Sequence, residues 1–290
     1  MPGATRSLLF VPGARPAIFE KAMGSGADIV CVDLEDAVPP SGKDAARPDG
    51  VAWLAGAAAG DACTRALRIN GLKTVAGLRD LVAVADAAPA AGLVVMPKVD
   101  EAAEVRIVDA ALTEAGSDAG LVVLIESVDG LENVQEIVAA SSRVKLAMFG
   151  AVDLSAELGC DNAPGPLAYA RARVVHAARR AGVPAMDVPS LNFRDLDAVA
   201  AEAEAARAMG YSGKAAIHPT NVGAVNGVFT PTPEQVARAR KVIAAYEASE
   251  TGLVVLDGKL IEAPVIRAMR ARMEAAEAAG VAPDQAEAGE

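Results

Sequence analysis

The chain has few of the residues that bind zinc or cross-link secreted proteins. It contains two histidines and three cysteines in 290 residues. So few histidines argue against a nitrogen-rich zinc site. Cys31, Cys63 and Cys160 are odd in number and widely spaced, which fits neither a disulfide framework nor a zinc motif. We therefore expect each cysteine to pack as a small apolar side chain in a reducing cytoplasm.

Long apolar runs are also missing, although 52% of the residues are hydrophobic. Alanine supplies much of that fraction, and no stretch approaches the roughly 18 apolar residues that a membrane span needs. The first residues lack the apolar segment and cleavage site of a secretory signal. A net charge of −11 argues against nucleic acid and anionic membranes as partners, but leaves room for an anionic small molecule that meets a local cluster of basic groups. These features predict a soluble, cytoplasmic protein.

Short apolar, β-branched runs alternate with segments of helical spacing along most of the chain. Eight such runs are candidate strands: 6–13, 28–36, 64–70, 92–98, 120–127, 145–153, 183–190 and 213–219. Helical patterns between them, such as 72–88, 167–181 and 195–209, give a strand, helix, strand order. Eight units of this kind predict a (β/α)₈ TIM barrel. The alternative is a doubly wound open sheet, but the chain has no G-x-G-x-x-G fingerprint.

The chain is longer than the roughly 250 residues typical of one such barrel. We assign residues 1–230 to a catalytic barrel domain and residues 231–290 to a C-terminal helical extension. The extension should contain a helix over 234–250, a short apolar segment and a second helix over 265–279. It could serve as a lid or as an arm onto a neighbouring subunit.

Two consecutive candidate strands end in a carboxylate, Glu126 in the first and Asp153 in the second. In these barrels the C-terminal strand ends form the active site. Oxygen ligands that leave room for several waters suit Mg²⁺ or Mn²⁺. The alternative is that each carboxylate caps a helix or pairs with an arginine. The pair on adjacent strands favours a metal site.

Arg68 stands where an apolar strand would otherwise continue, so its guanidinium needs a partner. It could hold a substrate carboxylate, or form a salt bridge with an acid of the preceding strand end, Asp33, Glu35 or Asp36, and the two roles are compatible. At least one of the three acids should support the site indirectly. His218 is a candidate general base, and equally a residue that fixes its loop through a backbone bond.

Motifs spread over nearly the whole chain resemble one family. In order they are RSLLFVPGARPAIFEKA, VDLEDAV, LRIN, MPK, IES, GAVDLSAELG, GKAAIHP and GKLIEAPV. They resemble the citrate lyase β-subunit-like proteins, which include malyl-CoA and citramalyl-CoA lyases and belong to the HpcH/HpaI aldolase and citrate lyase superfamily. The resemblance implies a TIM barrel with a C-terminal extension, a homotrimer or dimer of trimers, and Mg²⁺ bound by Glu126 and Asp153.

The same resemblance implies roles for further residues. Positions that match coenzyme A or substrate contacts are Phe10, Arg15, Lys21, Arg68, Glu126, Val152, Ile217 and His218. Arg68, Asp36 and Glu262 are the candidate catalytic residues. In the family, a carboxylate of the late motif reaches the site of an adjacent subunit and acts in proton transfer. That residue is commonly Asp, so Glu262 is a departure that would shift the acid by more than about one ångström.

The expected function is that of a Mg²⁺-dependent carbon–carbon lyase, with coenzyme A as part of its substrate. It would cleave a β-hydroxyacyl-CoA of the malyl-CoA or citramalyl-CoA type to acetyl-CoA and a 2-keto acid. Two alternatives remain: a malyl-CoA thioesterase, and a β subunit of a citrate lyase complex that works on an acyl carrier protein.

Overall fold

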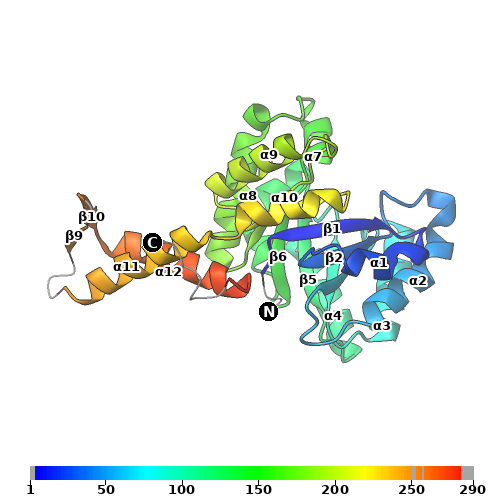
Figure 1. The fold of residues 1–290 in the computed structure, drawn as a ribbon. Helices are drawn as coiled ribbons and strands as arrows, with labels where there is room; N and C mark the ends of the chain where they lie inside the picture. Colours follow the sequence, from blue (N-terminus) through cyan, green and yellow to red (C-terminus); the bar gives the residue numbers. More distant parts are fainter. Residues whose placement is uncertain (1–3, 250–252, 257, 282–290) are drawn as a thin grey trace. The chain divides into compact units, whose positions relative to one another are not determined.

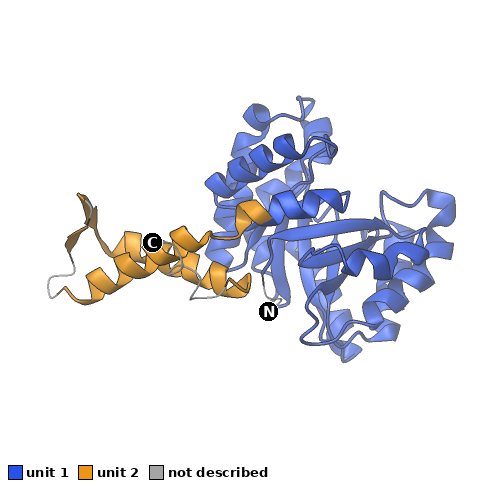
Figure 2. Cartoon of the chain, viewed as in Figure 1, with its two compact units in different colours: residues 1–226 blue, residues 227–290 orange. Residues whose placement is uncertain are grey.

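The computed structural model describes residues 4–249, 253–256 and 258–281. The chain divides into two compact units, residues 1–226 and 227–290 (Figure 2). The boundary lies inside helix α10 (Thr220–Phe229), a few residues before the boundary expected from the sequence. That the second unit acts as a lid stays a prediction.

The first unit (Figure 1) contains eight parallel strands that pair in chain order and close into a barrel. The pairing of β8 with β1 closes it. The strands are β1 (Ser7–Pro12), β2 (Ile29–Asp33), β3 (Thr64–Arg68), β4 (Leu93–Met96), β5 (Gly120–Ile125), β6 (Val144–Phe149), β7 (Ala185–Asp187) and β8 (Gly213–Ala216). The predicted (β/α)₈ barrel is confirmed, and the open sheet is wrong.

Helices surround the barrel and connect its strands. They are α1 (Phe19–Met23), α2 (Lys43–Ala55), α3 (Val75–Ala87), α4 (Ala102–Glu114), α5 (Val128–Glu132), α6 (Val134–Val138), α7 (Ala151–Leu158), α8 (Pro164–Ala181), α9 (Leu196–Met209) and α10. Short 3₁₀ turns, η1 (Pro16–Ile18) and η2 (Pro40–Gly42), precede α1 and α2.

Alternate residues of the strands fill the barrel interior, because successive strand side chains point to opposite faces. The interior cluster consists of Leu8, Ile29, Cys31, Ala66, Leu93, Val95, Val122, Leu124, Leu146, Met148, Met186 and Ala215, with Phe10 packed against it. Cys31 therefore packs as a small apolar residue, as expected. Cys63 is also buried, whereas Cys160 is only half-buried, so the expectation fails for Cys160.

Each barrel strand ends one to four residues earlier than the sequence predicted, and at β2 and β6 the difference moves three acids. β2 ends at Asp33, so Glu35 and Asp36 lie in the following loop. β6 ends at Phe149, and Asp153 lies in the first turn of α7 instead of at a strand end. Gly150 precedes that helix, in which Ala151, Leu154 and Ser155 are buried with helical spacing. The predicted strand 145–153 is therefore wrong beyond Phe149.

The second unit contains α11 (Pro233–Glu247), α12 (Ala263–Ala278) and a two-stranded antiparallel hairpin of β9 (Val254–Leu256) and β10 (Lys259–Ile261). Val242, Ile261 and Ile266 form its small core. The two expected helices are present, and the apolar segment between them supplies the hairpin. Across the described residues, no helix combines the length and apolarity that crossing a membrane would require.

Candidate active site

Three charged side chains enter the barrel mouth because they continue the inward-facing alternation of their strands. Asp33 follows Cys31 by two residues, Arg68 follows Ala66, and Glu126 follows Leu124, and all three preceding residues belong to the interior cluster. All three charged residues are buried. Charged groups lie together here because the strands are parallel and their C-terminal ends share one end of the barrel.

Arg68 is paired with acids, as the sequence indicated. Its Nε and Nη2 donate to the two carboxylate oxygens of Asp33 at 2.7 and 2.6 Å. The register of β2 and β3 places Asp33 directly beside Arg68. Although burial by itself lowers the pKa of Arg68, the hydrogen bonds and charge of Asp33 raise it above the ordinary value. Arg68 is therefore a permanent cation.

The loop after β2 adds two more acids to the same guanidinium. Arg68 Nη1 lies 3.0 Å from Glu35 Oε2 and 3.5 Å from Asp36 Oδ2. Glu35 is buried, whereas the Asp36 side chain is 58% exposed. Asp33 also accepts hydrogen bonds from the backbone of Glu35 and Ala37. Asp33 thus fixes both Arg68 and the loop, and Asp36 is the most accessible of the three acids.

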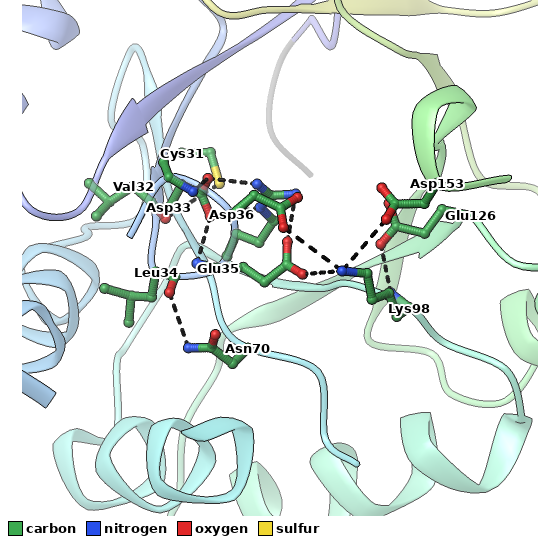
Figure 3. Close-up of polar contacts among 12 residues, drawn as sticks. Cys31, Val32, Asp33, Leu34, Glu35, Asp36, Asn70, Lys98, Glu126 and Asp153 are labelled. Atoms are coloured by element: carbon green, nitrogen blue, oxygen red, sulfur yellow. Dashed lines mark hydrogen bonds and ion pairs between the residues drawn. The ribbon is translucent and has the colours of Figure 1, made fainter. Parts of the chain in front are cut away.

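Lys98 follows β4 and contacts acids on both sides of the mouth. Its Nζ donates to Glu35 Oε1 at 2.7 Å and lies 3.7 Å from Asp153 Oδ1 and 3.8 Å from Asp36 Oδ1. Its backbone N–H donates to Glu126 Oε1 at 2.9 Å. Figure 3 shows the Lys98 side chain extending between Glu35 and Asp153.

Glu126 lies beneath a glycine that leaves room for it. A Cβ at position 150 would lie 2.5 Å from Glu126 Cβ and 2.6 Å from its Oε2, so only glycine fits there without moving the carboxylate. Burial raises the pKa of Glu126 to about 8, and the nearby charges of Asp153 and Glu35 act in the same direction. A buried carboxylate in this environment favours either a proton or a cation as its partner.

These groups line a cavity of about 420 Å³. Eight of the residues singled out from the sequence line it: Phe10, Asp33, Asp36, Arg68, Glu126, Val152, Asp153 and Ile217. The remaining wall is largely apolar and includes Leu124, Met148 and Pro189. The cavity therefore joins a charged end to an apolar wall, which suits an organic anion.

Glu126 and Asp153 also line a second cavity of about 360 Å³, together with Lys98, Asp100, Ser127, Asp129 and Glu157. No group of three or more His, Cys, Asp or Glu side chains in the described part of the chain is arranged to hold a metal ion. Two carboxylates do fit Mg²⁺, which usually keeps several waters and takes one or two protein carboxylates. The oxygen-only pair Glu126 and Asp153, open to a cavity on each side, fits such an ion.

The other candidate residues do not line the 420 Å³ cavity. Arg15 and Lys21 are exposed, near and within α1. His218 is exposed, its Nδ1 lies 2.7 Å from Thr220 Oγ1, and its ring stacks on Phe193. These contacts support the interpretation that His218 fixes its loop. Glu262 is the exposed N-cap residue of α12 in the second unit, and its predicted catalytic role stays a prediction.

From the sequence, Lys98 was expected only as the polar end of the fourth strand and Gly150 only as part of a turn, and neither was given a role in the site. Lys98 ends the MPK motif, but nothing local indicates its left-handed backbone, with φ of 51°. Lys43 was also missed: its Nζ donates to the carbonyls of Leu34 and Glu35 at 3.2 and 2.9 Å and supports the acidic loop. A lysine preceded by Pro40 and Gly42 carries no signal of that contact.

Fold and site together define the class of protein: a (β/α)₈ barrel whose paired acids and buried arginine gather at the C-terminal mouth, where enzymes of this architecture carry their active sites. A family model described as HpcH/HpaI aldolase/citrate lyase matches residues 6–219, and the chain belongs to that family. The predicted resemblance is confirmed.

Two curated relatives match nearly the full length. The L-malyl-CoA/beta-methylmalyl-CoA lyase of Rhodobacter capsulatus is 35% identical, over 95% of this chain and 96% of the relative. The (3S)-malyl-CoA thioesterase of Cereibacter sphaeroides is 37% identical, over 94% of this chain and 95% of the relative. Among solved structures, protein CitE of Mycobacterium tuberculosis, in complex with magnesium, acetoacetate and coenzyme A, has a TM-score of 0.80 at 29% identity, covering 96% of this chain and 100% of that chain.

Proposed function

We propose that the protein is a Mg²⁺-dependent carbon–carbon lyase that cleaves a β-hydroxyacyl-CoA of the malyl-CoA or citramalyl-CoA type to acetyl-CoA and a 2-keto acid. The observation that carries the proposal is the convergence of Arg68, Glu126 and Asp153 on one 420 Å³ cavity. A lyase relative that matches almost the whole chain supports it. So does a structural relative in complex with magnesium and coenzyme A.

The charged end of the cavity suits the hydroxy-acid part of the substrate. Glu126 and Asp153 would hold the metal ion, which when bound supplies the positive charge that lowers the pKa of the substrate hydroxyl. Because Nε and Nη2 of Arg68 are occupied by Asp33, Nη1 is the nitrogen we assign to the substrate carboxylate. That carboxylate would replace the exposed Asp36 beside Nη1.

Two proton transfers must accompany bond cleavage. We assign the hydroxyl proton to Asp36, the exposed carboxylate of the cavity, since Asp33 is held by Arg68 and by two backbone amides. Glu262 would deliver the proton that converts the leaving enolate to acetyl-CoA. Its support is the family resemblance alone, which places this carboxylate at the site of an adjacent subunit.

The apolar wall of the 420 Å³ cavity would contact the rest of the thioester. Phe10, Val152 and Ile217 line the cavity and are the proposed pantetheine contacts, and His218 follows Ile217 directly. Arg15 and Lys21, both exposed, would meet the phosphates of coenzyme A. Met148 and Pro189 also line the cavity and would limit the size of the substituent on the carbinol carbon.

The thioesterase relative supports a second candidate function. A malyl-CoA thioesterase would need the same ion and arginine but would direct water to the thioester carbon. A third alternative, a β subunit acting on an acyl carrier protein, would also use Arg15 and Lys21. On the resemblance we further propose a cytoplasmic homo-oligomer, a trimer or a dimer of trimers.

A product analysis separates these functions. Purified protein with Mg²⁺ is given malyl-CoA and citramalyl-CoA, and acetyl-CoA, free coenzyme A, glyoxylate and pyruvate are followed by mass spectrometry. We expect acetyl-CoA with a keto acid, lost in Glu126→Ala and Asp153→Ala and retained in the control Glu136→Ala, an exposed residue of α6.

Other product patterns contradict the lyase. Free coenzyme A with intact malate or citramalate would assign the protein as a thioesterase. Turnover only after an acyl carrier protein replaces coenzyme A would assign it as the carrier-dependent subunit.

A further inference from the structure

Lys98 contacts both the proposed metal ligands and the acids around Arg68. Its backbone amide holds Glu126, and its ammonium lies between Glu35 and Asp153. Glu35 in turn contacts Arg68 Nη1 at 3.0 Å. A chain of contacts therefore runs from Asp153 through Lys98 and Glu35 to Arg68.

The backbone of Lys98 is unusual in a way that makes both contacts possible. Within the described residues, Lys98 and Ala88 alone among non-glycine residues have positive φ, 51° and 41°. This conformation is unfavourable for a residue with a Cβ. With this backbone conformation, the Lys98 amide donates to Glu126 while the side chain contacts Glu35 and Asp153. Backbone strain of this kind persists where several surrounding contacts together hold the residue in its conformation.

Charge at the mouth is unbalanced. Five carboxylates, those of Asp33, Glu35, Asp36, Glu126 and Asp153, line or adjoin the cavity. Arg68 pairs with the first three, and among the described residues Lys98 is the cation that lies beside Asp153. Lys98 and Asp153 are 44% and 41% exposed, so this contact is weak enough to exchange.

We propose that Lys98 is a positioning residue with two roles: its ammonium is the counter-cation of Asp153 until a divalent ion binds, and through Glu35 it keeps Arg68 oriented for the substrate carboxylate. This inference rests on the proposed function. When the ion binds, Lys98 gives up Asp153 and retains Glu35, whose contact at 2.7 Å is the shorter one. After the ion has bound, Lys98 therefore contacts only Glu35, which in turn contacts Arg68.

The first role is tested by direct metal binding, without turnover. Mn²⁺ is titrated calorimetrically into the full chain of the wild type, Lys98→Met, Lys98→Arg and the control Lys145→Met. Lys145 is the second residue of β6, at the opposite end of the barrel, and its Nζ donates to Ser142 O. We expect Lys98→Met to bind Mn²⁺ about three- to fivefold more tightly, because a competing cation is gone. The charge-retaining Lys98→Arg and the control should stay within about twofold of the wild type.

Unchanged or weaker Mn²⁺ binding by Lys98→Met would overturn the first role. Lys98→Gln repeats the comparison if the methionine variant does not fold. If the wild type binds no Mn²⁺, the proposed metal-dependent function itself is contradicted. Failure of that function can therefore be distinguished from failure of the role of Lys98.

The second role is tested with pyruvate, a small 2-keto acid, on the Mn²⁺-loaded protein. Lys98→Met and Glu35→Gln should each weaken pyruvate binding about three- to tenfold, and the double variant should be no weaker than either single variant. Additive losses would overturn the route through Glu35, because they would mean that Lys98 acts on the bound anion directly.

Discussion

Replacing Glu126 by Gln should remove a pH dependence of stability that one buried carboxyl creates. The pKa of Glu126 is raised from 4.5 to about 8 in the folded protein, mainly by burial. Between those values the folded state holds a proton that the unfolded state has released. The stabilisation is complete below pH 4.5 and disappears as the pH rises through 8.

The size of the effect follows from the two pKa values. In metal-free buffer, the wild type should lose about 4 kcal/mol of unfolding free energy relative to Glu126→Gln between pH 5 and pH 8.5, as an order-of-magnitude value. The glutamine variant cannot titrate, so subtracting its curve removes the contributions of all other groups.

Chemical denaturation in EDTA at pH 5, 7 and 8.5 measures the difference. Glu136→Gln, on the exposed side of α6, is the matched control for the substitution. The reasoning is refuted if the difference between wild type and Glu126→Gln stays constant with pH, or if it grows as the pH rises. Adding Mg²⁺ at pH 8.5 should restore stability to the wild type, since the ion then replaces the proton.

Three further substitutions test individual contacts. Gly150→Ala should weaken Mn²⁺ binding by at least about tenfold, measured by calorimetry, because the new Cβ would lie 2.5 Å from Glu126 Cβ; unaltered affinity would contradict the space argument. Arg68→Lys should lower kcat/KM about a hundredfold, since an ammonium cannot keep the two-oxygen contact with Asp33 and still meet a substrate carboxylate; activity near wild type would show that a simple charge suffices. Lys214→Met should cost about 1–3 kcal/mol of unfolding free energy, because Lys214 is 1% exposed and donates to buried Asp187, which would keep Arg171 as its remaining cation; a loss as small as that of Lys145→Met would refute this.

Local pattern was enough to identify the barrel and part of its site. Alternation of apolar residues is a property of the strand itself, so it places Arg68 and Glu126 in line with the interior residues two positions before them. The charged ends of successive runs then meet because the strands are parallel. Pairing of Arg68 with the acids of the preceding strand also followed, because a buried guanidinium requires a partner.

Contacts between loops could not be obtained in this way. Asp153 lies in the first turn of a helix, and Gly150 is required only because Glu126, which directly follows β5, occupies the space where a Cβ at position 150 would lie. The left-handed backbone of Lys98 likewise depends on acids contributed by distant parts of the chain.

The sequence by itself determined the fold class through its hydrophobic period. Its ordered motifs determined the family and the identity of the two acids and the arginine proposed to act, because period and motif are both local properties. Only the tertiary structure decided which acids Arg68 and Lys98 contact and how deeply Glu126 is buried. Those properties arise from barrel closure, which sets the register between strands and brings together residues far apart in the chain.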